Sequence, residues 1–388
     1  MTTESASPSP SVLLLVAGLG GAIGSTLAAA AALLPRRPEL IRPYLTTFQN
    51  YPRLPAPENF HLAGWDQARR PLVEALAAHG VVPESLWAPA AEAIAAIPLL
   101  AAPDPGRSLA AQTEALAADM ASLRRRFAGT PAVLVNLLPA APLQDLSRYR
   151  DLDALAAEAD GSALPDLAYV LAAIQARIPV VNFTPNAVEA PCVLAAAEAA
   201  GVPLAGRDGK TGQTYFKVAL ASALKARGLN VDGWYSANIL GNADGANLDD
   251  PLRAAGKVAN KTELLDEILG YRVGARYGRS THMVRIDYYP PRGDAKEAWD
   301  VIDLLGLFEL PMSLRIDLQG RDSILAAPLV LDLARWMTAL QGAGRRGAVP
   351  ELGFYFKKAV GPCPPLTFAE QLTALDRLAA VCLQETSP

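Results

Sequence analysis

The sequence predicts an α/β fold, in which a parallel sheet covered by helices is interrupted by an inserted α/β unit. The chain opens with an apolar run, a glycine turn and an alanine-rich stretch, and apolar runs then alternate with amphipathic stretches up to residue 206. Such alternation is typical of parallel sheets, because the connecting helices cover the sheet. Near Thr214 the pattern changes to several strand-like runs. We expect residues 11–214 and 323–388 to form the parallel unit and residues 215–322 the insert, with residues 1–10 disordered.

Residues 12–34 carry no charge and are long enough to cross a bilayer, so a membrane helix is one interpretation of them. An acidic start at Glu4, four central glycines and the pair Ser25-Thr26 oppose it. The stretch divides better into a strand over residues 12–17, a turn over residues 18–24 and a helix over residues 25–34.

The glycine turn has the spacing of a Rossmann-like dinucleotide site. Gly18 and Gly20 would permit a tight turn close to a pyrophosphate, Gly24 would let the helix pack on the strand, and the helix N-terminus would face the anion. A plain strand-to-helix turn is the alternative. The predicted cofactor-binding residues of this turn are Gly18, Gly20, Gly21, Ala22, Ile23 and Gly24.

Asp66 is the candidate for the carboxylate that binds the ribose of a dinucleotide. The usual acidic residue about twenty positions after the turn is missing, because Glu39 follows no strand. Asp66 ends a predicted strand over residues 60–66, which would place it beside the turn. It would equally serve as the N-cap of a helix from Gln67 onward.

The later elements follow the same alternation. We predict strands over residues 132–136, 180–183 and 203–206, with helices over residues 165–177 and 188–200. Asn136 and residues 182–186 fall at strand ends, where ligands of open α/β sheets gather, although they would also suit caps and a proline turn. In the insert we predict a helix from residue 214 to 227 and strands over residues 234–239, 282–289 and 312–318.

Composition excludes several classes of function. The net charge of −4 over 388 residues gives no basic field for nucleic acid or for an anionic membrane. The three cysteines lack metal-ligand spacing and favour a reduced, cytoplasmic setting over a disulfide framework. The three histidines are scattered, so neither a zinc site nor a catalytic histidine is predicted, and any cation requirement is unknown.

Polar side chains cluster at the edges of the insert. Residues 206–214 place small residues, hydroxyls and amides at a strand-to-helix junction, which suits a phosphate monoester. Residues 238–247 form a second amide-rich segment, predicted to be a loop. Residues 293–296 are predicted to lie at the start of another helix. Together these segments predict a pocket for a phosphorylated polyol beside a nicotinamide, with amines and carboxylates and without histidine.

The lysines point to the same pocket. All eight lie between Lys210 and Lys358 in a chain with twenty-seven arginines, so arginine serves wherever charge alone is needed. Lysine is a compact cation whose pKa falls on burial, which suits proton transfer. Lys257 and Lys261 would share a helix face, and aromatic neighbours of Lys357 would lower its pKa.

In these ordered blocks the chain resembles the myo-inositol-1-phosphate synthases. The blocks are residues 18–26 (GLGGAIGST), 64–66 (GWD), 206–214 (GRDGKTGQT), 240–248 (LGNADGANL), 256–261 (GKVANK), 293–296 (GDAK) and 322–333 (DSILAAPLVLDL). The resemblance implies a homotetramer whose subunit interface is made by the insert, and an NAD-dependent, redox-neutral cyclisation of D-glucose 6-phosphate to 1L-myo-inositol 1-phosphate. The steps would be oxidation at C5, enolisation, intramolecular aldol addition and reduction.

The resemblance also implies roles for individual residues. The catalytic residues would be Lys257, Lys296, Lys357, Asp208 and Asp244. The substrate-binding residues would be Thr211, Gly212, Gln213, Thr214, Lys261, Asn238 and Asn242. Cofactor contacts beyond the glycine turn would come from Asp66, Asn136, Asp208 and Asp322. Which lysine is the general base stays open.

Several positions depart from the family's pattern. Ala22 and Ile23 replace asparagines, Ile239 replaces a histidine, and residues 137–139 read Leu-Leu-Pro where a polar strand end is expected. Two alternatives therefore stay open: a paralogue that cyclises another sugar phosphate, and a non-catalytic NAD-binding structural or sensor protein.

Overall fold

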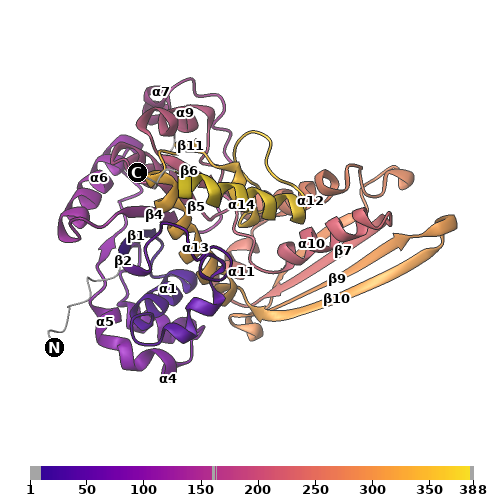
Figure 1. Ribbon diagram of the computed structural model, residues 1–388, viewed down its shortest axis with the longest axis horizontal. Coiled ribbons are helices and arrows are strands. Elements are labelled where there is room, and N and C mark those ends of the chain that lie inside the picture. Colours follow the sequence, from indigo (N-terminus) through magenta and orange to yellow (C-terminus); the bar gives the residue numbers. More distant parts are fainter. Residues whose placement is uncertain (1–9, 160–161, 163, 385–388) are drawn as a thin grey trace.

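The computed structural model describes residues 10–159, 162 and 164–384, which form two sheets with their helices (Figure 1). We predicted that residues 1–10 are disordered, and all of them except Pro10 lie outside the described residues. The first sheet is parallel, with strand order β11-β6-β5-β4-β1-β2-β3. Its strands are β1 (Ser11–Ala17), β2 (Asn59–Asp66), β3 (Leu99–Ala101), β4 (Ala132–Asn136), β5 (Val180–Asn182), β6 (Pro203–Gly206) and β11 (Gly347–Ala348).

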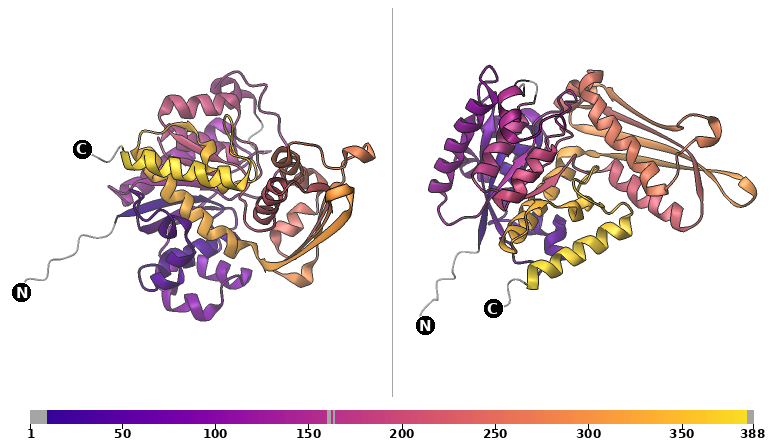
Figure 2. Two further views of the ribbon diagram at one scale, coloured as in Figure 1. Left: turned by 45° about the vertical axis from the view of Figure 1, so that its right-hand side comes forward. Right: turned by 90° about the horizontal axis from the view of Figure 1, so that it is seen from above.

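Helices cover both faces of this sheet (Figure 2). Alternate residues of β1 point to opposite faces, so Leu14 and Val16 pack in one core and Leu13 and Leu15 in the other. The first core includes α1 (Ala22–Leu33), α3 (Leu72–His79), α5 (Ala91–Ala95), α13 (Asp322–Gly342) and α14 (Phe368–Gln384). The second includes α6 (Leu109–Arg126), α7 (Leu152–Glu158), α8 (Asp166–Gln175) and α9 (Pro191–Ala200). The short helices α2 (Thr46–Gln49) and α4 (Glu84–Trp87) lie between β1 and β3 in the chain.

The chain leaves the first sheet after β6 and returns to it at β11. Between these strands lies a second sheet of order β10-β9-β7-β8, in which only β7 and β8 pair in parallel. Its strands are β7 (Asn230–Leu240), β8 (His282–Tyr288), β9 (Ala295–Leu305) and β10 (Pro311–Arg321). One face packs on α10 (Gln213–Ala226) and α12 (Pro251–Leu269), while β9 and β10 extend as a long hairpin away from the first sheet (Figure 1).

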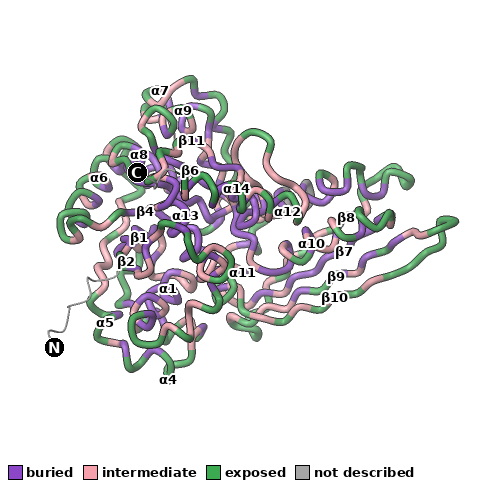
Figure 3. Tube along the Cα trace, viewed as in Figure 1, coloured by how far each residue is buried: buried purple, intermediate pink, exposed green. Residues whose placement is uncertain are grey.

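The uncovered face of the second sheet carries large apolar side chains. Tyr235 stacks near Trp299, with ring centroids 5.7 Å apart, and Met283 lies opposite Tyr235 in the register. Met283 and Trp299 are 50% and 37% exposed. Strand β10, at the edge of this sheet, has no buried residue and is accordingly pink and green in Figure 3.

The apolar stretch of residues 12–34 is β1 followed by α1, as the division into strand and helix predicted. Another helix, α13, is long and apolar enough to cross a membrane by length and composition, but 72% of its most apolar window is buried inside the protein. Its buried residues, among them Val330, Leu331 and Trp336, pack in the first core. Burial explains its apolar composition without a bilayer.

Several predicted elements are wrong in detail. Helix α1 begins at Ala22, three residues before the predicted start, and no helix follows Asp66 directly, because α3 begins at Leu72. Helix α9 begins only at Pro191, which is favoured at the first helical position. Residues 293–296 lead into strand β9 and not into a helix.

Candidate functional site

A cavity of about 460 Å³ lies where the glycine turn after β1 faces the start of α10, helices α11 (Ala243–Leu248) and α12, and the start of α13. The turn and the segment after β6 follow carboxyl ends of parallel strands. Ligands of open α/β sheets bind at this edge. The cavity therefore brings residues of both sheets to one place.

The glycine turn forms one wall of the cavity. Gly18 has a φ of +86°, and the backbone amides of Gly18 and Leu19 both donate to the carbonyl of Trp65. A Cβ on Gly24 would lie 2.4 Å from the carbonyl oxygen of Leu19, so only glycine permits this approach of α1 to the turn. Gly18, Gly21, Ala22, Ile23 and Gly24 line the cavity.

Asp66 lies behind the turn, where Gly20 donates its backbone amide to Oδ2 at 3.0 Å. The other carboxylate oxygen accepts from the amide of Ala68, which makes a local turn and not a helix cap. Gly20 thus binds Asp66 and does not line the main cavity. Asp66 instead lines a neighbouring cavity of about 510 Å³, which shares Gly18 and Gly21 with the first.

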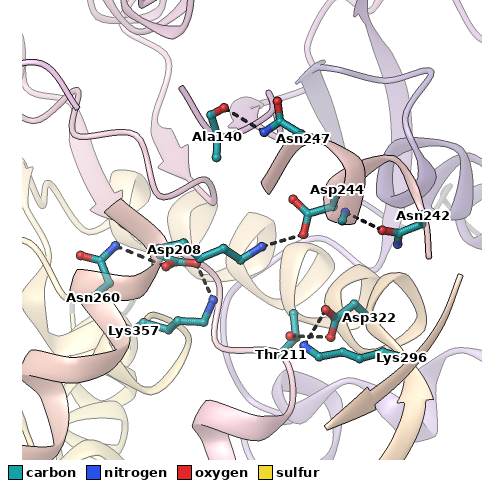
Figure 4. A network of polar contacts seen from close by, with 12 residues as sticks. Ala140, Asp208, Thr211, Asn242, Asp244, Asn247, Asn260, Lys296, Asp322 and Lys357 are labelled. Carbon is teal, nitrogen blue, oxygen red and sulfur yellow. Dashed lines mark hydrogen bonds and ion pairs between the residues drawn. The ribbon is translucent and has the colours of Figure 1, made fainter. Parts of the chain in front are cut away.

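Three lysines and three carboxylates form ion pairs on the opposite wall (Figure 4). The Nζ atom of Lys357 lies 2.5 Å from Oδ1 of Asp208, and both side chains are less than a tenth exposed. Lys257 pairs with Asp244 at 2.7 Å, and Lys296 pairs with Asp322 at 2.8 Å. All six residues line the cavity.

The ion pairs shift the pKa values of their members in different directions. Burial lowers the pKa of Lys357, and Asp208 opposes that shift. Burial alone would lower the pKa of Lys257, yet Asp244 and Asp208 together raise it above its usual value. The result is one amine that gives up its proton more readily beside one that keeps it.

Asp322 shows the opposite balance to a typical buried acid. Burial would raise its pKa, but the ammonium groups of Lys296, Lys257 and Lys357 hold that pKa well below the usual range. Its Oδ1 atom also accepts a hydrogen bond of 3.2 Å from the hydroxyl of Thr211. Asp322 therefore stays ionised and ties the start of α13 to the turn before α10.

Residues 211–214 line the cavity at the N-terminus of α10, where the first amides of a helix have no partner within the helix. Gly212, the N-cap, provides no side-chain hydrogen bond. Such a helix start binds anions with backbone amides. Lys261 lies in α12, but its side chain is outside the described part of the structure.

The segment of residues 238–247 is a strand end, a turn and a helix, and not the predicted loop. Asn242 caps α11 by accepting from the amide of Gly245, donates to Oδ1 of Asp294 at 3.1 Å, and lines the cavity. Asn238 is fully buried, and its amide donates to the carbonyl of Arg285. Asn238 therefore does not line the cavity, and Ile239, its neighbour in the alternating strand, points to the opposite face.

Asn136 is also fully buried and does not line the cavity. Its amide donates to Asp166 at 2.7 Å and to Asn182 at 3.1 Å, in a network that joins β4, β5 and α8. Its geometry favours the strand-end scaffold over direct contact with a cofactor.

His79 lines the cavity, contrary to the prediction of a pocket without histidine. One ring nitrogen lies 3.0 Å from the carbonyl oxygen of Gly20, 59 positions earlier in the chain. A histidine at the end of a short helix has no distinctive spacing, so no sequence pattern identifies it as a site residue. Among the described residues, no group of three His, Cys, Asp or Glu side chains is arranged to hold a metal ion.

Comparison with known proteins confirms the resemblance that the sequence blocks predicted. Residues 212–323 match the sequence model of the family described as myo-inositol-1-phosphate synthase. Inositol-3-phosphate synthase 1 of Bacteroides thetaiotaomicron is 43% identical over 195 residues, which cover 50% of this chain and 46% of that protein. The Saccharomyces cerevisiae inositol-3-phosphate synthase is 33% identical over 175 residues, covering 44% of this chain and 32% of that protein. The matches thus span less than half the length of these relatives.

Solved structures support the fold. The inositol-3-phosphate synthase of Caenorhabditis elegans superposes with a TM-score of 0.85 at 21% identity, covering 97% of this chain and 86% of that chain. A myo-inositol-1-phosphate synthase-related protein from Thermotoga maritima superposes with a TM-score of 0.74 at 20% identity, covering 96% and 98% of the two chains. The Rossmann-like α/β fold class is therefore confirmed.

The pKa of Asp322 predicts a pH-dependent effect of Asp322→Asn on stability. Since the folded pKa lies below the unfolded value of about 3.9, the carboxylate stabilises the fold fully above that value and less as the pH falls through and below it. At pH 7 we expect the variant to lose about 1–3 kcal/mol of unfolding free energy, because charged hydrogen bonds are lost. Urea unfolding of the parent and the variant at pH 7 and at pH 3.5 measures the loss of stability and its dependence on pH.

The exposed carboxylate of Asp249 offers a matched control, and Asp249→Asn should change stability little at either pH. A deficit of Asp322→Asn that is the same at both pH values would contradict the assignment of Asp322 as an ion-paired carboxylate.

Proposed function

We propose, from the confirmed resemblance to the myo-inositol-1-phosphate synthases, that this chain is an NAD-dependent enzyme that cyclises D-glucose 6-phosphate to 1L-myo-inositol 1-phosphate. One observation supports this most strongly. A single cavity joins a glycine turn typical of dinucleotide sites, an anion-binding helix start and three lysine–carboxylate pairs.

The residues that line the two cavities at the glycine turn fit the binding of NAD. The close approach that Gly24 permits leaves the start of α1 at the wall of the cavity, and Gly18 and Gly21 of the turn line both cavities. Gly18, Gly21, Ala22 and Ile23 would hold the cofactor's centre, and Asp66 would accept hydrogen bonds from a ribose. NAD, when bound, would supply the acceptor for the C5 hydride and the means to return it.

The lysines would divide the remaining chemistry between them. Lys357, whose pKa is lowered, is suited to move a proton to and from the substrate as a general base. Lys257, whose pKa is raised, stays charged and would stabilise negative charge that develops on substrate oxygens. Lys296 and the amides of residues 211–214 would hold the phosphate group.

A second candidate is cyclisation of a different sugar phosphate. The part of the cavity wall that follows β4 is apolar at Leu137, Leu138 and Pro139, all of which line the cavity. An apolar wall accommodates a substrate that lacks a hydroxyl at that position better than one that carries it. Product analysis with glucose 6-phosphate distinguishes the two candidates.

Incubation with D-glucose 6-phosphate and NAD should yield inositol phosphate without accumulation of NADH, because the hydride returns to the same substrate. NMR identifies the product, and the absorbance of NADH follows the cofactor. Unphosphorylated glucose is the control and should be a very poor substrate, since the helix start would lack its anion. No cyclised product, or NADH rising in proportion to product, would contradict the proposal.

Replacing Lys357 by Arg should lower kcat by about 10²–10⁴-fold, because arginine keeps the charge but does not release a proton near neutral pH. In the parent, kcat should rise with pH as Lys357 loses its proton, and the variant should lack that rise. Lys358→Arg is the matched control, since Lys358 carries a partly exposed side chain that lies 3.6 Å from Glu267. A Lys357→Arg variant with near-parental kcat and an unchanged pH profile would remove Lys357 from the chemistry.

We further propose that the chain forms a homo-oligomer, which the resemblance implies to be a tetramer, through the uncovered face of the second sheet. Tyr235, Met283 and Trp299 place large apolar side chains on that face, and exposed apolar patches favour association. In sedimentation experiments the protein should have a mass that is a multiple of 40.9 kDa, and Trp299→Glu should lower that mass. Tyr44→Glu, on the first unit and 71% exposed in the parent, should not. A monomeric parent would refute the proposal.

A further inference from the structure

A second group of buried polar side chains lies between α10 and the second sheet, beside the anion-binding helix start. Asp300 is 4% exposed, and its Oδ2 atom accepts a hydrogen bond of 3.1 Å from Nε2 of Gln213. Its Oδ1 atom accepts from Nε1 of Trp234 at 2.7 Å and from the hydroxyl of Ser236. Donors on α10 and β7 thus engage both oxygens of a carboxylate on β9.

Lys217 supplies a positive charge near this carboxylate. Its side chain is 2% exposed, its Nζ atom donates to the hydroxyl of Ser236 at 3.0 Å, and it lies 2.7 Å from Nε2 of His282. Burial lowers the pKa of Lys217 to about 8, and the charge of Asp300 opposes that shift. The opposite charges limit the cost of burying either group alone.

Gln213 connects this network to the cavity. It is the first residue of α10 and lines the cavity together with Thr211, Gly212 and Thr214. A carboxylate only accepts hydrogen bonds, so Asp300 determines that the amide nitrogen of Gln213 faces the sheet. The side chain of Gln213 thereby ties the helix start to β9.

We infer that Asp300 is a positioning residue, which holds the anion-binding turn of residues 211–214 in its binding geometry through Gln213. The inference rests on the proposed function for the identity of the ligand. Because the turn would bind a phosphate group in the substrate and in the transition state alike, loss of its geometry weakens binding more than chemical rate. A residue that only stabilised the fold would leave both unchanged in the folded protein.

The test is the variant Asp300→Asn, titrated calorimetrically with D-glucose 6-phosphate in the absence of NAD, so that no turnover occurs, and with inorganic phosphate in the presence of NAD. An asparagine offers one acceptor oxygen in place of two, so it does not satisfy Gln213, Trp234 and Ser236 in the same way. We expect affinity for both ligands to fall about tenfold and KM for glucose 6-phosphate to rise likewise, with kcat within about threefold of the parent. Asp153→Asn, at an exposed carboxylate in α7 of the first unit, is the control and should match the parent.

A second variant, Trp234→Phe, keeps the carboxylate of Asp300. It removes one donor to Oδ1, the oxygen that does not bind Gln213. It should weaken phosphate binding about threefold, and it carries the test if Asp300→Asn does not fold. Unchanged phosphate affinity in the folded variants, or a loss confined to kcat, would overturn the inference. Weakened phosphate binding in a protein whose parent forms no product from glucose 6-phosphate would support the inference and reject the proposed function.

Discussion

The site depends on charge compensation among ammonium groups and carboxylates that the fold collects in one partly buried cavity. Asp208 follows β6, Lys257 and Asp244 lie in helices of the insert, Lys296 is the second residue of β9, and Lys357 follows β11 of the first sheet. An unpaired buried charge costs free energy. Each of these segments is therefore stable at the cavity only when the segment that carries its partner charge is also there. The ion pairs therefore couple the two sheets as well as defining the chemistry between them.

The same compensation separates the properties of the lysines. Lys257 faces several carboxylates and keeps its proton, whereas Lys357 is more deeply buried and gives it up more readily. Similar side chains thus acquire different roles from their surroundings, as acid–base chemistry near neutral pH requires. The glycine turn completes the arrangement, because the absence of Cβ atoms lets α1 start close enough to open its N-terminus to the same cavity.

Much of the first sheet was predictable, because its strands are continuous apolar runs that end in polar residues or glycines. The strand over residues 132–136 and the strand over residues 203–206 match β4 and β6. Strand β9 was missed because Trp299 lies on the uncovered face between buried Ala298 and Asp300, which obscures the alternation of apolar residues. The cavity-lining lysines and acids were found through ordered sequence blocks, whereas His79 and Asp300 depend on tertiary contacts that no local spacing records. Asn136 and Asn238 are the converse case, because these predicted site residues are fully buried and a polar residue at a strand end also serves the interior.

The proposed cyclisation requires that a hydride leaves C5 of a sugar phosphate and returns to the same molecule within one cavity. Glucose 6-phosphate that carries deuterium at C5 tests this most directly, with the product analysed by mass spectrometry and NMR. The proposed return of the hydride predicts that the deuterium stays in the cyclised product on the carbon derived from C5 of the sugar, even when unlabelled NADH is present in the solution. Loss of the deuterium to the pool of NADH, or its absence from the product, would contradict it.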